Sequence, residues 1–142
     1  MRILGIDFGD KSIGLAVSDP LFLIAQSLGR YRLQSKEKNK IYFTKLISEY
    51  DIGKIVIGFP LRMNGTEGTR TEKTRKFGCW LKNISGLPVV FWDERLTTKQ
   101  ASRLISQQNL KRKNKKNLDH QVSAAIILSA YLESIRNHTN DH

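Results

Sequence analysis

Short apolar runs alternate with longer segments of helical periodicity along the chain. Residues 3–8 form the first apolar run, and in residues 13–17 large side chains alternate with small ones. The segment between them contains glycine and is short enough for a tight turn, so we expect two antiparallel strands. Residues 20–35 show no regular pattern, except that residues 31–33 allow a third strand.

Helical and strand patterns then alternate through the middle of the chain. The apolar residues of segment 36–50 recur at helical spacing, so this segment should pack one face on the sheet. Residues 55–57 predict a buried strand, which ends before Pro60 because proline cannot donate to a β-ladder. Thr69 and Glu72 have the spacing of a capping box and predict a second helix. Its inward stripe should consist of Phe77, Trp80, Leu81 and Ile84.

The last third of the chain adds one strand and two helices. Residues 89–92 predict a buried strand that places Asp93, Glu94 and Arg95 at its carboxyl end. Thr97 and Gln100 can cap a following helix, whose inward residues are Ala101, Leu104 and Ile105. A basic loop then leads to a strongly apolar helix from about residue 119 to 136, followed by a disordered tail from about residue 137.

This order of elements indicates one α/β domain over residues 1–142. An antiparallel start followed by alternating strands and helices predicts a mixed central sheet with helices on both faces. A chain of 142 residues has the common size of one domain. The carboxyl ends of the central strands should form the edge where loops and functional residues gather.

The net charge of the chain predicts that this α/β domain binds a polyanionic partner. There are 24 Lys and Arg residues against 13 Asp and Glu, for a formal net charge of +11. Such an excess indicates nucleic acid or an anionic membrane surface. Membrane binding would need an amphipathic basic helix or a lipid anchor, and the N-terminus meets an acidic residue after only a few apolar ones, so we expect nucleic acid and no membrane as the partner. The N-terminus has neither the pattern of a signal peptide nor that of a spanning segment, so we expect a cytoplasmic protein. The lone Cys79 suits a reducing compartment, and we expect it to be a half-buried packing residue.

Asp7 is the first candidate for chemistry, because it lies inside an otherwise apolar strand. A carboxylate there is costly unless a positive partner accompanies it. Gly5 and Gly9 lie on the same face of the strand and should leave the space around Asp7 open. This combination indicates a metal or phosphate site, although a cap of the turn at Asp10 would also account for Asp7.

Glu94 and Asp119 complete the candidate set. Glu94 directly follows a strand and projects from the loop-bearing edge, whereas its neighbour Asp93 fits the dipole of a following helix. Asp119 opens the last helix and would by itself be an ordinary N-cap. Together with Asp7 these carboxylates can converge on one point, where their oxygens suit one or two Mg²⁺ or Mn²⁺ ions. Two such ions can catalyse phosphodiester hydrolysis.

Phosphate contacts are expected from cationic and small residues near these acids. The basic loop stands directly before Asp119, and its charges would attract the backbone of a nucleic acid. The expected substrate-contacting residues are Gly9, Lys11, Ser12, Arg95, Lys111, Arg112, Lys113, Lys115 and Lys116. His120 could touch substrate or transfer a proton, although a surface position is the simpler interpretation.

Four motifs in this order resemble the YqgF, or RuvX, group of RNase H-like proteins. They are Gly5-Ile6-Asp7-Phe8-Gly9 with Lys11-Ser12-Ile13-Gly14, then Gly58-Phe59-Pro60 leading into Met63-Asn64-Gly65-Thr66-Glu67-Gly68, then Asp93-Glu94-Arg95-Leu96-Thr97-Thr98, and the C-terminal acid before an Ala- and Ile-rich helix. The resemblance covers nearly the whole chain.

The resemblance implies an RNase H-like fold, a cytoplasmic protein and maturation of the 5′ end of pre-16S ribosomal RNA by a metal-dependent nuclease. It places the acidic triad of the family on Asp7, Glu94 and Asp119. In one respect the sequence departs from the family pattern, because a gapless alignment puts His120 at the third acidic position. Either a small insertion restores Asp119 or the third ligand differs, since one residue turns a helical side chain by about 100°.

Three other functions remain open at this stage. The chain could cleave branched DNA, as a Holliday-junction resolvase does, and would then act as a homodimer, whereas trimming of one strand needs only a monomer. It could be a non-catalytic factor that binds nucleic acid or ribosomal particles. An ATPase or sugar kinase of the actin-like type is disfavoured, because those enzymes use two domains and this chain has room for one.

Overall fold

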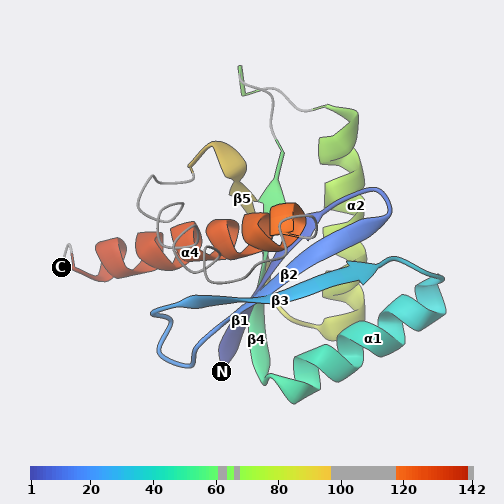
Figure 1. Ribbon diagram of the computed structural model, residues 1–142, viewed down its shortest axis with the longest axis horizontal. Helices are drawn as coiled ribbons and strands as arrows, with labels where there is room; N and C mark the ends of the chain where they lie inside the picture. Colours follow the sequence, from blue (N-terminus) through green and yellow to red (C-terminus); the bar gives the residue numbers. More distant parts are fainter. Residues whose placement is uncertain (61–63, 66–67, 97–117, 141–142) are drawn as a thin grey trace.

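A five-stranded mixed sheet forms the centre of the molecule, with the strand order β3-β2-β1-β4-β5 (Figure 1). The first three strands along the chain pair in antiparallel fashion, and the last two run parallel to β1. The strands are β1 (Arg2–Phe8), β2 (Ser12–Ser18), β3 (Ala25–Arg32), β4 (Ile52–Phe59) and β5 (Val89–Asp93). This arrangement confirms the predicted mixed sheet with antiparallel first strands.

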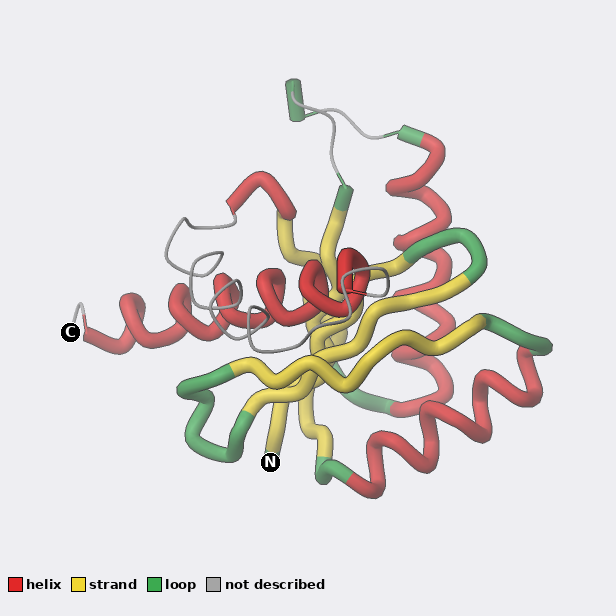
Figure 2. Tube along the Cα trace, viewed as in Figure 1, coloured by secondary structure: helices red, strands yellow, loops and turns green. Residues whose placement is uncertain are grey.

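The computed structural model describes residues 1–60, 64–65, 68–96 and 118–140 (Figure 2). For residues 118–123 and 138–140 it describes only the helical backbone. The expected helix that begins near Thr97 and the basic loop before Asp119 therefore lie outside the described residues.

Helices cover both faces of the sheet, as the sequence predicts. In Figure 1, α4 passes in front of the strands, and its side chains form one core with Ile3 and Val56. On the other face, α1 and α2 contribute Phe43 and Leu81 to a second core. The helices are α1 (Lys36–Glu49), α2 (Thr69–Ser85) and α4 (Leu118–Asn140), and a short 3₁₀ turn, η1 (Glu94–Leu96), follows β5.

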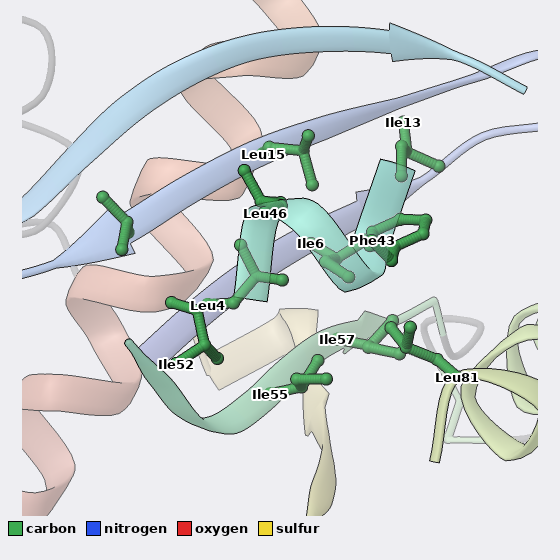
Figure 3. Close-up of a cluster of buried hydrophobic side chains, with 11 residues drawn as sticks. Leu4, Ile6, Ile13, Leu15, Phe43, Leu46, Ile52, Ile55, Ile57 and Leu81 are labelled. Carbon is green, nitrogen blue, oxygen red and sulfur yellow. The ribbon is translucent and has the colours of Figure 1, made fainter. Parts of the chain in front are cut away.

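The core beneath α1 and α2 is built from alternate residues of the central strands. Leu4 and Ile6 of β1 meet Ile55 and Ile57 of β4, and Phe43 of α1 closes the cluster (Figure 3). All five side chains are fully buried. Because strand side chains alternate between faces, this placement turns Asp7 toward the opposite face, beneath α4.

Close contact between α4 and the sheet depends on two glycines. A Cβ atom at Gly5 would lie 2.8 Å from Cβ of Leu128 and 3.3 Å from the carbonyl oxygen of Ala124. A Cβ atom at Gly58 would lie 2.5 Å from Cδ1 of Ile127. The expectation that Gly5 leaves open space near Asp7 is therefore wrong, since α4 fills that space.

Several expected elements differ in extent or position. The third strand, β3, occupies half of residues 20–35, a segment that the sequence pattern left irregular. Helix α4 continues to Asn140, beyond the end expected near residue 136. The strand β5 is half-buried rather than buried, because among the described strands it pairs with β4 alone, at the edge of the sheet.

The start of α2 also differs from the predicted capping box. The N-cap residue is Gly68, so Thr69 is already helical and cannot cap the helix. The Thr71 hydroxyl instead accepts a hydrogen bond from the Gly68 backbone N–H at 3.1 Å and donates one to the Pro60 carbonyl at 2.9 Å. Thr71 thereby ties the start of α2 to the end of β4.

Cys79 is exposed, which contradicts its prediction as a half-buried packing residue. The buried positions of α2 are Thr71, Thr74, Gly78 and Leu81, and the position of Cys79 on the helical wheel turns it away from the sheet.

Among the described helices, none combines the length and the apolar character that crossing a membrane requires.

Candidate active site

Three parallel strands end side by side at one edge of the sheet. In the register of the sheet, Ile6 of β1 pairs with Ile57 of β4, and Gly58 pairs with Trp92 of β5. Asp7 directly follows Ile6 on β1. Glu94 is the first residue after the end of β5. Gly58 therefore lies between the two strand ends that carry the predicted acids.

The Glu94 carboxylate extends over Gly58 toward β1. A Cβ atom at Gly58 would lie only 2.7 Å from Oε1 of Glu94 and 3.2 Å from its Cγ, so the side chain occupies the space that any larger residue would need. Asp7 is 6% exposed on the same face of the sheet. The two acids that the sequence singled out thus approach each other at one place.

The environment of Glu94 favours its neutral form. Burial raises the pKa of the Glu94 carboxyl above its ordinary value, and the negative charge of Asp7 raises it further. The cation of Arg70 acts in the opposite direction, and Asp93 adds a smaller upward contribution. Two carboxylates held together at the cost of desolvation and repulsion are typical of a site that binds a positive group.

Asp93 pairs with Arg95 at this edge of the sheet. Its carboxylate accepts hydrogen bonds from the backbone N–H of Arg95 at 3.0 Å and from the Arg95 guanidinium at 2.8 Å. These side-chain hydrogen bonds lower the pKa of Asp93. The pairing fixes the 3₁₀ turn that carries Glu94. The helix whose dipole Asp93 is expected to favour lies outside the described residues.

Arg95 lies between this turn and the loop after β4. A Cβ atom at Gly65 would have the Arg95 guanidinium as its nearest neighbour, with Nη1 at 3.4 Å. Gly65 itself has a positive φ of 84°, which glycine adopts readily. The guanidinium is exposed enough to meet a ligand, with 40% of its side chain accessible. The structure therefore brings a predicted substrate-contacting cation to the candidate site.

Arg70 is a site residue that sequence reasoning missed. It lies in the first turn of α2, and its charge acts on Glu94. A cation in the first turn opposes the helix dipole, which favours negative groups at that end. This unfavourable position was the only available signal in the sequence.

The remaining predicted residues are placed as follows. Gly9 is buried after β1, Lys11 is exposed, and Ser12 begins β2, where its hydroxyl interacts with the Arg30 guanidinium. Asp119 and His120 belong to the first turn of α4, but their side chains are outside the described part of the structure. The cationic residues expected to bind phosphate just before α4 are also outside it: Lys111, Arg112, Lys113, Lys115 and Lys116.

The described part of the site suits a divalent cation only in part. Asp7 and Glu94 supply hard oxygen ligands, and burial followed by the charge of Asp7 raises the pKa of the Glu94 carboxyl. Within the described residues no group of three or more His, Cys, Asp or Glu side chains is arranged to hold a metal ion. A complete site would need a further ligand, and Asp119 is the candidate.

Glu94→Gln is expected to stabilise the protein in the presence of a chelator. A carboxyl whose pKa is raised on folding binds its proton more tightly in the folded state, so its ionised form costs stability at neutral pH. We expect the Tm at pH 7 to rise by a few degrees, and the gain to shrink as the pH falls through the raised pKa. Thermal unfolding followed by circular dichroism would measure it, with the exposed Glu49→Gln as control. An unchanged or lower Tm would contradict the electrostatic description of the site.

The RuvX family model, described as Holliday junction resolvase, matches residues 1–134 of the sequence. The chain belongs to the RuvX family. A protein from Agathobacter rectalis named "Putative pre-16S rRNA nuclease" is 43% identical over 140 residues, which are 96% of this chain and 98% of that protein. A protein of the same name from Caldanaerobacter subterraneus is 43% identical over 138 residues, with coverage of 96% and 99%. The sequence-based assignment to this family of nucleases is therefore confirmed.

Solved structures similar to this RuvX-family chain share its fold. Thermus thermophilus RuvC in complex with a Holliday junction has a TM-score of 0.67 at 15% identity, over 98% of this chain and 97% of RuvC. The fowlpox virus resolvase with its junction DNA has a TM-score of 0.59 at 15% identity, with coverage of 95% and 99%. These likenesses confirm the predicted RNase H-like fold.

Proposed function

We propose that this RuvX-family chain is a divalent-metal-dependent nuclease that hydrolyses phosphodiester bonds in the precursor of 16S ribosomal RNA. The observation that carries the proposal is the approach of Glu94 to Asp7 across Gly58. The names of its relatives support the substrate, and the net charge of +11 supports a polyanionic one.

In the proposed mechanism, Asp7, Glu94 and Asp119 hold the cations. Bound there, Mg²⁺ or Mn²⁺ ions would supply an activated water and stabilise the leaving oxygen. Asp7 is nine-tenths buried and Glu94 is half-buried, so both carboxylates are held in place by packing before the substrate arrives. This preorganisation reduces the rearrangement that the chemical step requires.

Cations around the acids orient the phosphate backbone. Arg95 is held by Asp93 at 2.8 Å, and its planar guanidinium can bind two phosphate oxygens at once. Arg70 and Lys11 are exposed at the same edge of the sheet. We propose that Arg95 and Arg70 align the scissile phosphate, while Lys11 and Ser12 contact the adjoining nucleotides.

The proposal is tested by cleavage of a 5′-extended 16S precursor transcript. We expect Mg²⁺- or Mn²⁺-dependent shortening of its 5′ end, seen as new ends by primer extension, and no cleavage when a chelator is present. A four-way DNA junction assayed in parallel tests the activity for which the family model is named. Cleavage of the junction alone would replace the RNA substrate with DNA, and cleavage of neither would refute the nuclease.

A further inference from the structure

A pocket lies on the opposite face of the sheet from Asp7 and Glu94. Its volume is about 550 Å³, which is within the range of small-molecule sites. We call it the α1–α2 pocket and define it by its aromatic and cationic lining residues: Phe8, Phe77, Trp80, Lys36, Lys73 and Lys76. The proposed mechanism uses none of these side chains.

The aromatic side of the pocket is a rigid platform. The rings of Phe8 and Phe77 stack with centroids 4.8 Å apart, and the ring of Trp80 is 5.7 Å from that of Phe77. Beneath them, the fully buried Phe43 ring contacts both Phe77 and Trp80 edge-on. The three lining rings are themselves half-buried, so part of their surface remains available in the pocket.

The lysines of the pocket are available to a phosphate. The Lys73 Nζ atom lies 3.5 Å from Oδ1 of Asp10, and the Lys76 Nζ atom lies 3.7 Å from Oε1 of Glu72. More than half of each lysine side chain is nevertheless exposed. Exposed ion pairs at such distances contribute little to stability, so both ammonium groups remain able to bind a phosphate. Lys36 is the first residue of α1, where the helix dipole attracts anions and disfavours a cation. The exposed Lys36 side chain is therefore available to an anionic group in the pocket.

The pocket and the candidate active site are linked through β1. Phe8 directly follows Asp7, and the two side chains point to opposite faces of the sheet. Asp10, which also lines the pocket, belongs to the turn between β1 and β2. A nucleic-acid strand that crosses this turn would therefore have its scissile phosphate on one face and a neighbouring nucleotide on the other.

We propose that the α1–α2 pocket binds an unpaired nucleotide of the substrate strand. The base stacks on the Phe77 and Trp80 rings, and Lys36, Lys73 and Lys76 bind the flanking phosphates. Stacking of bases on aromatic rings beside a cationic groove is how proteins bind single strands without sequence preference. This inference rests on the proposed nuclease function, because it assigns the pocket to the same substrate.

Tryptophan fluorescence gives the first test. The sequence holds two tryptophans, so Trp92→Phe leaves Trp80 as the only reporter, and Asp7→Asn in the same protein prevents cleavage. The double variant is titrated with an oligouridylate about eight nucleotides long, whose binding is followed separately by anisotropy of a dye-labelled copy. We expect Trp80 emission to be quenched in parallel with binding. Unchanged emission at saturation would exclude stacking in the pocket.

A matched set of lysine variants gives the second test. Lys36→Ala, Lys73→Ala and Lys76→Ala are combined in one protein. In the control, Lys40→Ala, Lys45→Ala and Lys82→Ala remove the same charge from exposed residues that do not line the pocket. We expect the pocket variant to lose at least about tenfold in affinity, with a salt slope smaller by about 2 for single strands. The control should lose much less. Equal losses in both proteins would overturn the proposal.

The outcomes separate this inference from the proposed function. If the wild type cleaves the precursor but the pocket variant binds like the control, the pocket assignment fails and the nuclease stands. If Trp80 is quenched and the pocket variant is weakened while no substrate is cleaved, the nuclease fails and a single-strand-binding pocket remains.

Discussion

Asp7→Asn is expected to lower the rate of precursor cleavage by about 10²–10³-fold or more, which is the scale of losing one electrostatic group from an active site. Asparagine has nearly the same shape as aspartate, but it lacks the charge that a divalent cation requires. Asp7 is 6% exposed, so water cannot replace the lost ligand freely. Initial rates of transcript cleavage at saturating Mn²⁺ would measure the effect.

The matched control for Asp7→Asn is Asp51→Asn. Asp51 precedes β4 at the other end of the sheet, where its carboxylate pairs with the N-terminal amine at 3.2 Å. It has a positive φ of 52°, a conformation that asparagine also tolerates. We expect the control to cleave at the wild-type rate and both variants to remain folded. A folded Asp7→Asn protein with wild-type activity would remove Asp7 from the catalytic residues.

Gly58→Ala should reduce activity far more than stability. Its new Cβ atom would meet Oε1 of Glu94 at 2.7 Å and Cδ1 of Ile127 at 2.5 Å, both of which end flexible side chains. These side chains can move aside at modest cost, but the Glu94 carboxylate then leaves its place beside Asp7. Displacements of about 1 Å in an active site can cost about 10²-fold in rate, which is the loss we expect.

Two further glycine variants separate this effect from general destabilisation. At Gly5 the new Cβ atom would meet the carbonyl of Ala124 and Cβ of Leu128, which cannot move without shifting α4, so Gly5→Ala should cost about 1–3 kcal/mol of unfolding free energy. At Gly53 it would meet only the side chain of Met1 at the chain terminus, so Gly53→Ala should be nearly neutral. Chemical denaturation and cleavage rates would be measured on all three. A Gly58→Ala protein with full activity would show that Glu94 need not lie over Gly58.

The fold was predictable where hydrophobic period and turn chemistry agreed. The apolar run of residues 3–8, the alternation of large and small residues over 13–17 and the helical stripe of residues 36–50 predicted the antiparallel start of the sheet and its first helix. The period alone could not find β3, because an edge strand needs fewer buried residues, and after the buried Ala25 this strand has only half-buried and exposed positions. The start of α2 was wrong by one residue, since the cap depends on a hydrogen bond from the Gly68 backbone that residue types do not reveal.

The candidate site was predictable as a set of acids but not as a geometry. Asp7 and Glu94 were identifiable because each breaks an apolar pattern at a strand end. The role of Gly58 could not be foreseen, because it depends on which side chain of a distant segment extends over the sheet. Arg70 was missed for the same reason, since its effect on Glu94 comes from tertiary packing. The stacking surface of Phe77 and Trp80 was missed because their helical stripe also indicated core.

The two outer strands of the sheet have a consequence for association between copies of the chain. β5 is only five residues long, is preceded by Pro88 and ends at Asp93. β3 carries the exposed Arg30 and Arg32, and its pairing with β2 is interrupted by a register shift. Shortness, charge and irregularity are the features by which natural sheets prevent another strand from joining their open edges. Aggregation through pairing of edge strands between two copies of the chain is therefore disfavoured. Many copies of this basic protein can then bind close together on a nucleic acid without aggregating.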